Sequence, residues 1–291
     1  MQLVIQSAVS GLLVGGLYGL IALGLALSFG VLKVLNVAHG ELVMLGGYVT
    51  FYLVAVVGLD PFLSLPLVFV TLFGLGVFLY VVLFRFVVSY DIEVRIKNSL
   101  LISFGLVLIL QAVAVTFFTG DDRAIVTDYS SFAITIESIR IPFIRLAGLI
   151  VAIVLAVGLQ LLLDRTTFGH AVKATSEDWS LATLTGIDVR KIYLVTFALS
   201  AALAGVAGTL IALGFSVSPS IGLAWTLKAL IVVVLAGLGS MRGLIVAGML
   251  LGLAEGLASV YLGGTYREIV ALGAFLLVLL VRPQGLFGRS T

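Results

Sequence analysis

Eight apolar segments of transmembrane length dominate this 291-residue sequence. A helix needs about 20 apolar residues to cross about 30 Å of hydrocarbon. The segments lie at about residues 3–30, 42–59, 62–84, 99–118, 144–163, 192–214, 243–262 and 267–281. A shorter apolar segment at about 226–238 is bounded by Gly, Ser and Pro, which is typical of a broken or re-entrant helix. The sequence therefore predicts an all-α polytopic membrane protein of eight or nine transmembrane helices, with residues 1–291 forming one domain.

Composition supports a chain that lies in lipid. Hydrophobic residues make up 62% of the sequence and charged residues only 10%, against about 25% charged in soluble domains. The net charge of +2 argues against nucleic-acid binding, and the absence of cysteine excludes disulfides and thiolate metal sites. With two histidines, a transition-metal site is not expected. Because no Lys or Arg precedes Lys33, we expect the first segment to be a retained helix rather than a cleaved signal peptide.

The positions of Lys and Arg predict the orientation. If residues 164–191 are cytoplasmic and 226–238 crosses, eleven basic residues lie inside and four lie outside. The inside set is Lys33, Arg85, Arg95, Lys97, Arg165, Lys173, Arg190, Lys191, Arg242, Arg282 and Arg289; the outside set is Arg123, Arg140, Arg145 and Arg267. This places the N-terminus outside and the C-terminus inside. A re-entrant 226–238 would invert everything after it, so the charge bias favours a true crossing.

Small residues recur every four positions in three of the segments. The ladders are Gly11, Gly15 and Gly19; Ser200, Ala204, Gly208 and Ala212; and Gly248, Gly252 and Gly256. Small residues at this spacing allow helix backbones to approach closely in lipid. We expect these faces to be helix-packing surfaces, although membrane helices are also generally rich in glycine.

A polar external loop is predicted at about residues 119–143. Asp121, Asp122, Arg123 and Asp128 make its first half hydrophilic. Isoleucines then alternate with polar residues on both sides of Glu137 and Ser138, a pattern consistent with a short β-hairpin or with an irregular loop. This loop is a candidate landing surface for an extracytoplasmic partner.

The cytoplasmic loop at about residues 164–191 has room for a short amphipathic helix between Gly169 and Gly186. Its predicted apolar face carries Val172, Thr175, Trp179 and Ala182, and its polar face carries Lys173, Glu177 and Ser180. Gly186 suits the C-terminal cap, and Asp188 suits the N-cap of the next membrane helix. Such a helix could dock into a groove on a cytoplasmic partner, or the stretch could be an ordinary solvated loop.

Six polar residues lie in or beside apolar segments and are candidates for the transport pathway or for helix interfaces. They are Asn36, His39, Glu41, Gln111, Lys228 and Glu255. Polar groups at membrane depth are costly unless they are paired, so each one marks either a functional site or a helix contact. Lys228 could also extend its ammonium group toward the membrane surface.

Four blocks of this sequence resemble the branched-chain amino-acid ABC permeases of the LivH type, and together they cover essentially the whole chain. The first comprises residues 16–25 (GLYGLIALGL), 36–41 (NVAHGE) and 44–48 (MLGGY). The second is the cytoplasmic loop, with Gly169, Ala171, Ala174, Asp178, Ala182, Gly186 and Ile187 at matching positions. The third is Lys228 and Ala229 with residues 237–240 (GLGS), and the fourth is residues 282–288 (RPQGLFG). His170, where Arg is common, and the bulky Trp179 depart from the pattern.

The resemblance implies a permease subunit that forms half of the pathway of an importer in a bacterial or archaeal cytoplasmic (inner) membrane. Its implied partners are a second, different permease chain, two cytoplasmic ATPases that bind ATP and Mg²⁺, and an extracytoplasmic binding protein. The cytoplasmic loop would be the coupling helix, with Gly169, Ala171, Ala174, Glu177, Asp178, Ala182 and Gly186 as its candidate ATPase-coupling residues. The implied cargo is branched-chain amino acids, and related permeases also move other amino acids, amides and urea.

No phosphate-binding G-x-x-x-x-G-K-[ST] motif and no catalytic constellation occurs in the sequence, so we expect neither an enzyme nor a cofactor on this chain. The alternative function is an ion-coupled secondary transporter of small polar solutes. That alternative requires a polar site near the midplane at broken helices. The segment at 226–238 and Glu255 fit it, but the two halves of the chain show no clear repeat. A membrane enzyme would lack a catalytic set.

Overall fold

The computed structural model describes residues 1–136, 139–237 and 240–288. Within them, eight helical segments are long and apolar enough to cross a membrane, which confirms the predicted fold class. They are α1 (Gln2–Leu32), α2 (His39–Phe51) with the π-helical turn η1 (Tyr52–Val56), α3 (Pro61–Leu79) with η2 (Tyr80–Phe84) and α4 (Arg85–Val87), α5 (Ile92–Phe118), α7 (Phe143–Arg165), α10 (Val189–Gly214), α12 (Met241–Tyr261), and α13 (Arg267–Val281) with η3 (Gly264–Tyr266). A shorter apolar helix, α11 (Ile221–Ala236), starts five residues before the predicted segment. Glu137, Ser138, Leu238, Gly239 and Arg289, which the sequence analysis used, lie outside the described residues.

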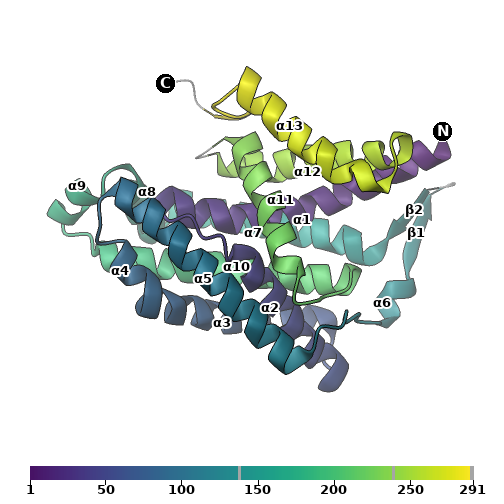
Figure 1. The fold of residues 1–291 in the computed structure, drawn as a ribbon, viewed down its shortest axis with the longest axis horizontal. Coiled ribbons are helices and arrows are strands. Elements are labelled where there is room, and N and C mark those ends of the chain that lie inside the picture. Colours follow the sequence, from purple (N-terminus) through teal and green to yellow (C-terminus); the bar gives the residue numbers. More distant parts are fainter. Residues whose placement is uncertain (137–138, 238–239, 289–291) are drawn as a thin grey trace.

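The bundle has two distinct ends. Figure 1 shows the N-terminus, α6 (Asp128–Ser131) and the strands β1 (Ala133–Ile136) and β2 (Ile139–Pro142) at one end of the long axis. The short helices α8 (Thr167–Glu177) and α9 (Trp179–Leu184) lie at the opposite end. We call these the hairpin end and the α8–α9 end. Because α1 and α7 each run from the hairpin end toward the α8–α9 end, the two predicted polar loops lie on opposite sides of the bundle.

The loop at residues 119–143 contains the β-hairpin that the isoleucine alternation suggested. β1 and β2 pair antiparallel, with Ile134 opposite Ile141 and Ile136 opposite Ile139. The hairpin is tied to the start of α1, since Gln6 Nε2 donates to the Arg140 carbonyl at 2.7 Å and Arg140 N–H donates to Gln6 Oε1 at 2.8 Å. The loop is therefore fixed to the transmembrane bundle.

Asp60 begins α3 and also holds the loop at residues 119–143. Its Oδ1 accepts the Phe62 N–H at 2.8 Å, and Pro61 occupies the first helical turn, where no backbone donor is needed. Tyr129 of α6 donates its hydroxyl to Asp60 Oδ2 at 2.9 Å. The Phe62 N–H is the main reason that the pKa of the Asp60 carboxyl is lowered. An ionised Asp60 thus joins the loop to the membrane domain.

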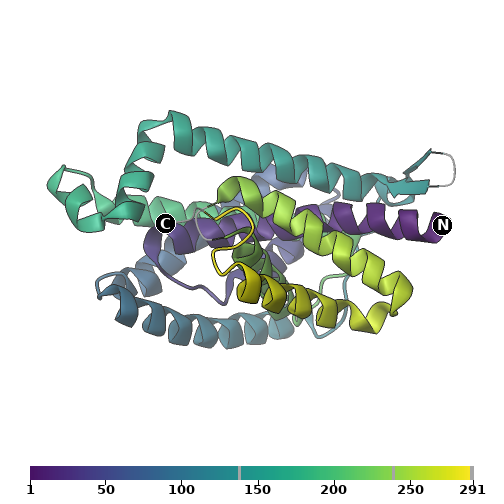
Figure 2. The ribbon, with the colours of Figure 1, turned by 90° about the horizontal axis from the view of Figure 1, so that it is seen from above.

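Two of the predicted glycine ladders pack against each other. α1 passes through the centre of the bundle and contacts α7, α10, α11 and α12 (Figures 1 and 2). A Cβ atom on Gly15 would lie 2.6 Å from Met249 Cα, and one on Gly19 would lie 2.7 Å from Ile245 Cα. Gly11 faces Gly252 and Gly256 of α12 in the same way. The backbones of α1 and α12 therefore touch along three turns, and the two helices are antiparallel.

The third ladder, on α10, contacts two different helices. Ser200 Oγ donates to the Gly24 carbonyl of α1 at 2.6 Å. A Cβ atom on Gly208 would lie 2.8 Å from the Gly47 nitrogen of α2. Further along α10, Gly148 of α7 lies against both Leu17 of α1 and Leu210 of α10. α10 is therefore antiparallel to α1, and it runs in the same direction as α12.

These directions determine the path of α11. Since α10 and α12 run the same way, the segment that joins them must return the chain from the hairpin end to the α8–α9 end. α11 has 16 residues, which span about 24 Å. It lies obliquely across the bundle in Figure 1 rather than along its axis. The chain thus returns across the bundle through α11 between α10 and α12. That this segment crosses the membrane stays a prediction.

The C-terminal end of α11 contacts residues 284–288, so the third and fourth sequence blocks that resemble the family lie side by side here. Leu286 N–H donates to the Leu235 carbonyl at 2.8 Å, and Phe287 N–H donates to the Ala236 carbonyl at 3.0 Å. Gly237 has a φ of +90° and packs against the backbone of Gln284 and Gly288. The C-terminal residues therefore satisfy the free carbonyls at the end of α11, which explains their motif in structural terms.

The outer helices expose apolar side chains. Exposed examples are Val70 on α3, Leu101 and Phe117 on α5, Val154 on α7 and Leu280 on α13. A soluble protein would not leave such faces to water, whereas lipid or another membrane subunit would cover them.

The contact between α1 and α12 predicts a strong effect of added volume. We expect Gly15→Leu to lower the thermal midpoint and the yield of folded protein in mild detergent, because its side chain would collide with the α12 backbone. Overpacking of this kind costs about 1–3 kcal/mol or more. The matched control is Gly158→Leu on α7, because a Cβ atom there meets nothing within 4 Å. Equal thermal midpoints for the two variants would contradict the close contact.

Candidate functional site

The loop at residues 164–191 folds into two short helices rather than the single predicted one. Thr166 caps α8, its Oγ1 accepting the Gly169 N–H at 3.0 Å. Asp178 then adopts an extended backbone, and its Oδ1 accepts the N–H groups of Ser180 and Leu181 at 2.8 and 3.0 Å. The prediction of one continuous helix was wrong because Asp178 ends α8 and starts α9.

The predicted caps at the end of this loop are confirmed. Gly186 has a φ of +87°, Gly186 N–H donates to the Thr183 carbonyl, and Ile187 N–H donates to the Ala182 carbonyl. This is the double hydrogen bond of a Schellman motif, which a residue with a side chain would make at a steric cost. Asp188 Oδ1 accepts the Lys191 N–H at 3.2 Å and caps α10. The N–H and ammonium groups of Lys191 lower the pKa of the Asp188 carboxyl.

The predicted coupling residues divide into a buried and an exposed set. Gly169 packs against the backbone of Leu162 and Leu163 at the end of α7, and Ala182 is also buried. Ala171 and Ala174 are half-buried, whereas Glu177, Asp178 and Gly186 are exposed. The buried members hold the α8–α9 pair against the bundle and do not face a partner.

Two exposed apolar residues of α9, Leu181 and Leu184, were missed by the sequence analysis. Trp179, predicted on one apolar face with Val172 and Thr175, is 45% exposed while those two are buried, because the helix restarts there. Leu181 is 61% exposed and Leu184 is 81% exposed. In the sequence, these side chains are recognisable as apolar residues in an otherwise polar loop. Together, Trp179, Leu181 and Leu184 form the apolar tip of α9.

A second cluster lies where α2 begins inside the bundle. His39 Nε2 donates to the Ile21 carbonyl at 3.1 Å, and Ile21 is eleven residues before the end of α1. At 1.5 Å per residue this is about 16 Å along α1. Asn36 Oδ1 accepts the Ala38 N–H at 3.1 Å, just before the helix starts. Asn36 and His39 therefore hydrogen-bond to the backbone at the start of α2 and within α1.

Glu41 and Gln111 of this cluster contact each other. Glu41 is fully buried, and its Oε1 accepts a hydrogen bond from Gln111 Nε2 at 3.1 Å. Its carboxyl lies against Gly222 of α11, where no side chain would fit. Next to it, Gly40 N–H donates to Thr226 Oγ1 at 2.8 Å, and Thr226 donates to the Val37 carbonyl at 3.0 Å. The start of α2 is thus joined to α11 in the interior.

Lys228 and Glu255 form a largely buried ion pair between α11 and α12. Tyr18 of α1 donates its hydroxyl to Glu255 Oε2 at 2.8 Å, and Lys228 Nζ lies 5.8 Å from the centroid of the Tyr18 ring. Lys228 is therefore paired and does not extend to the membrane surface. The pair fixes α11 between α1 and α12, with Gly222 and Thr226 of the same helix contacting the Glu41 cluster.

Within the described part of the chain, no three His, Cys, Asp or Glu side chains come together as a metal site would require. Several of the polar groups described above bind one another across helices.

Comparisons with known proteins identify the family. The family model described as "Branched-chain amino acid transport system / permease component" matches residues 7–279. The chain is 32% identical to the high-affinity branched-chain amino acid transport system permease protein BraD of Pseudomonas aeruginosa, over 98% of this chain and 96% of that protein. It is 30% identical to the permease protein LivH of Escherichia coli K12, with the same coverage of both chains.

A second type of permease is similar over part of the chain. The Escherichia coli K12 permease protein LivM is 34% identical over 149 residues, which are 50% of this chain and 34% of LivM. No solved structure matches the chain significantly. All the relatives named are transport permease subunits, and the family model covers nearly the full length. The chain therefore belongs to the family of branched-chain amino acid transport system permease components.

Proposed function

We propose that this chain forms half of the translocation pathway of an ATP-driven importer for branched-chain or related amino acids. The observation that carries the proposal is the α8–α9 pair, held on the bundle by its buried face while the apolar tip of α9 projects outward. The names of the relatives supply the cargo class. An unpartnered apolar tip on a membrane protein suits docking into a groove on another subunit.

The α8–α9 end is the cytoplasmic side in this proposal. Lys33, Arg85, Arg165, Lys173 and Lys191 belong to elements that end or begin there. Positively charged loops remain on the cytoplasmic side of a membrane. The N-terminus and the β-hairpin then face outward, in the cytoplasmic (inner) membrane of a bacterium or archaeon. The C-terminus lies inside.

The proposed partners follow from this orientation. Two ATPases, which carry the ATP and Mg²⁺, bind at the α8–α9 end, and an extracytoplasmic binding protein delivers the cargo at the hairpin end. A second permease chain of a different sequence completes the pathway, in line with the existence of LivH-named and LivM-named relatives. This chain itself binds no cofactor and catalyses no reaction. The ion-coupled transporter that the sequence also allowed is not favoured by the family.

The apolar tip predicts a docking defect without a folding defect. We expect Leu184→Asp to abolish co-purification of ATPases from gently solubilised membranes, because a charge replaces the most exposed apolar side chain of the tip. Uptake should fall by more than about tenfold, since a carboxylate in an apolar interface is left unpaired. The level of folded permease in the membrane should stay unchanged.

The matched control is Val126→Asp, which places the same charge on an apolar residue that is 88% exposed at the hairpin end. Arginine at Gly169 or Ala182 is a poorer test, because both positions are buried and a failure could reflect misfolding. Normal ATPase recovery with Leu184→Asp would refute docking at the tip.

The proposed dependence of transport on ATP gives a second, independent prediction. In vesicles that contain the complete transporter and its binding protein, leucine accumulation should require ATP and should stop with vanadate. Collapse of the proton and sodium gradients should leave it unchanged, and leucine, isoleucine and valine should compete with one another more strongly than urea does. Accumulation that survives without ATP and disappears with the ion gradients would instead establish the secondary transporter.

A further inference from the structure

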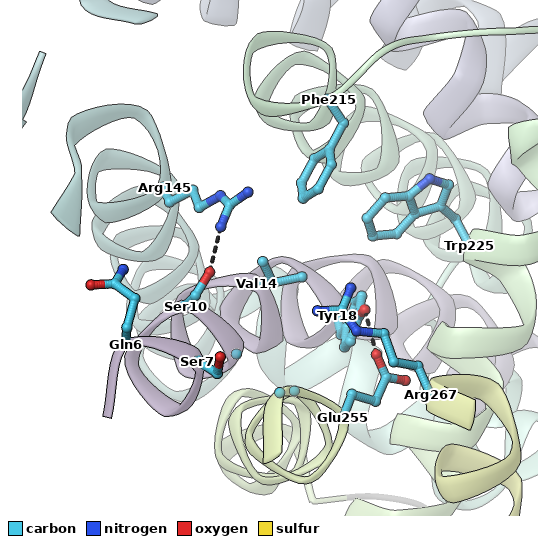
Figure 3. Close-up of a pocket in the computed structure, with 13 residues that line it drawn as sticks. Gln6, Ser7, Ser10, Val14, Tyr18, Arg145, Phe215, Trp225, Glu255 and Arg267 are labelled. Carbon is cyan, nitrogen blue, oxygen red and sulfur yellow. Dashed lines mark hydrogen bonds between the residues drawn. The ribbon is translucent and has the colours of Figure 1, made fainter. Parts of the chain in front are cut away.

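A pocket of about 320 Å³ lies at the hairpin end, and of the polar clusters described above only Tyr18 and Glu255 line it. α1 runs along it, the first turns of α7 and α13 contribute to its sides, and residues around the α10–α11 connection close it (Figure 3). The volume is at the lower end of the range for ligand pockets, about 300–1,000 Å³, and suits a small molecule. Nothing in the proposed function assigns this pocket a role.

The pocket has an excess of positive charge. Arg145 and Arg267 both line it, and in the part of the chain that the structure describes neither lies within 4.0 Å of a carboxylate. Glu255, which also lines the pocket, is already paired with Lys228. Neither guanidinium group therefore has a carboxylate of its own in the pocket, and the carboxylate of a bound ligand would pair with them.

Arg145 is held in position to bind such an anion. Its Nη1 donates to Ser10 Oγ of α1, and its guanidinium carbon lies 5.4 Å from the centroid of the Phe215 ring. Figure 3 shows the guanidinium over the pocket, near Ser10 and Phe215. An arginine that only anchored α7 would extend into water at the membrane surface. Arg145 instead is half-buried and retains further N–H donors, which suit a carboxylate.

One wall of the pocket is largely apolar and aromatic and begins beside Arg145. Phe215 and Trp225 pack edge to face, with their ring centroids 6.1 Å apart. The ring centroids of Trp225 and Tyr18 are 5.7 Å apart. Val14 projects from α1 below these rings (Figure 3). A ligand with a carboxylate and a compact apolar body would use both Arg145 and this wall at once, since aromatic surfaces provide most of the burial in such sites.

We propose that this pocket is an outward-facing binding site for an apolar amino acid, with Arg145 holding the α-carboxylate and Val14, Phe215 and Trp225 enclosing the side chain. Arg267, which is exposed at the rim, attracts the carboxylate toward the pocket. The assignment rests on the proposed function for its cargo class, and it adds the residues that receive the cargo.

The probe for this site is photo-leucine, a diazirine analogue of leucine. The complete transporter in lipid nanodiscs would be equilibrated with it and irradiated, and the labelled peptides would be identified by mass spectrometry. We expect labels near Val14 or between Phe215 and Trp225. Excess leucine should remove them, whereas leucinamide, which lacks the carboxylate, should not.

Arg145→Gln should reduce this labelling by about tenfold or more, because hydrogen bonds to a charged group are lost. Arg145→Lys should retain part of it. The matched control is Arg140→Gln, which removes an exposed arginine of the same end that does not line the pocket. Val14→Trp should block labelling by filling the pocket without a change in charge, so the test does not depend on one variant.

Two kinds of failure can be told apart. If the wild-type transporter accumulates leucine but the label lies elsewhere, for example beside Glu41 and Gln111, the pocket assignment is wrong and the proposed function stands. The same holds if Arg145→Gln labels like wild type or if leucinamide competes as well as leucine. If the wild-type transporter neither accumulates leucine nor is labelled, the proposed function fails and the pocket assignment fails with it.

Discussion

The direct contact between the backbones of α1 and α12 is the constraint on which the other helices depend. Helices in lipid gain little from hiding apolar surface, because the lipid tails are equally apolar, so association depends on close packing. Gly11, Gly15 and Gly19 remove the side chains that would separate α1 from α12. With α12 this close, Glu255 lies within reach of Tyr18. The close packing of α12 on α1 therefore also determines where α11 and the pocket at the hairpin end lie.

The buried polar groups then specify how the helices fit together. Lys228 and Glu255 compensate each other at membrane depth, and removal of either one would leave an unpaired charge, which costs about 3–5 kcal/mol. Arg95 is buried too, and its Nη1 donates to the Leu32 carbonyl at 3.1 Å, where α1 ends. These contacts join α11 to α12 and α5 to α1, so they select one arrangement among many that apolar packing alone would allow.

The sequence was sufficient for the transmembrane helices because hydrophobic length is a local property. The glycine ladders also identified packing faces correctly, since the spacing of four can be read along one helix. The pairing of Lys228 with Glu255 could not be predicted, because it depends on which helices are neighbours. The break at Asp178 was hidden for a different reason: Val172, Thr175, Trp179 and Ala182 keep helical spacing across it, and only the capping geometry of Asp178 reveals two helices.

Helix α7 connects the two sites that we assign to function. It has 23 residues, about 34 Å in length, and no proline or π-helical turn interrupts it. Arg145 stands in its first turn, beside the proposed amino-acid pocket, and the Leu162 and Leu163 backbone at its other end packs against Gly169 of α8. Gly169 leaves no space for a side chain between the two helices, so α8 packs directly on the end of α7. Helix α7 therefore physically links the α8–α9 pair at one end to Arg145, and through it to Ser10 of α1, at the other.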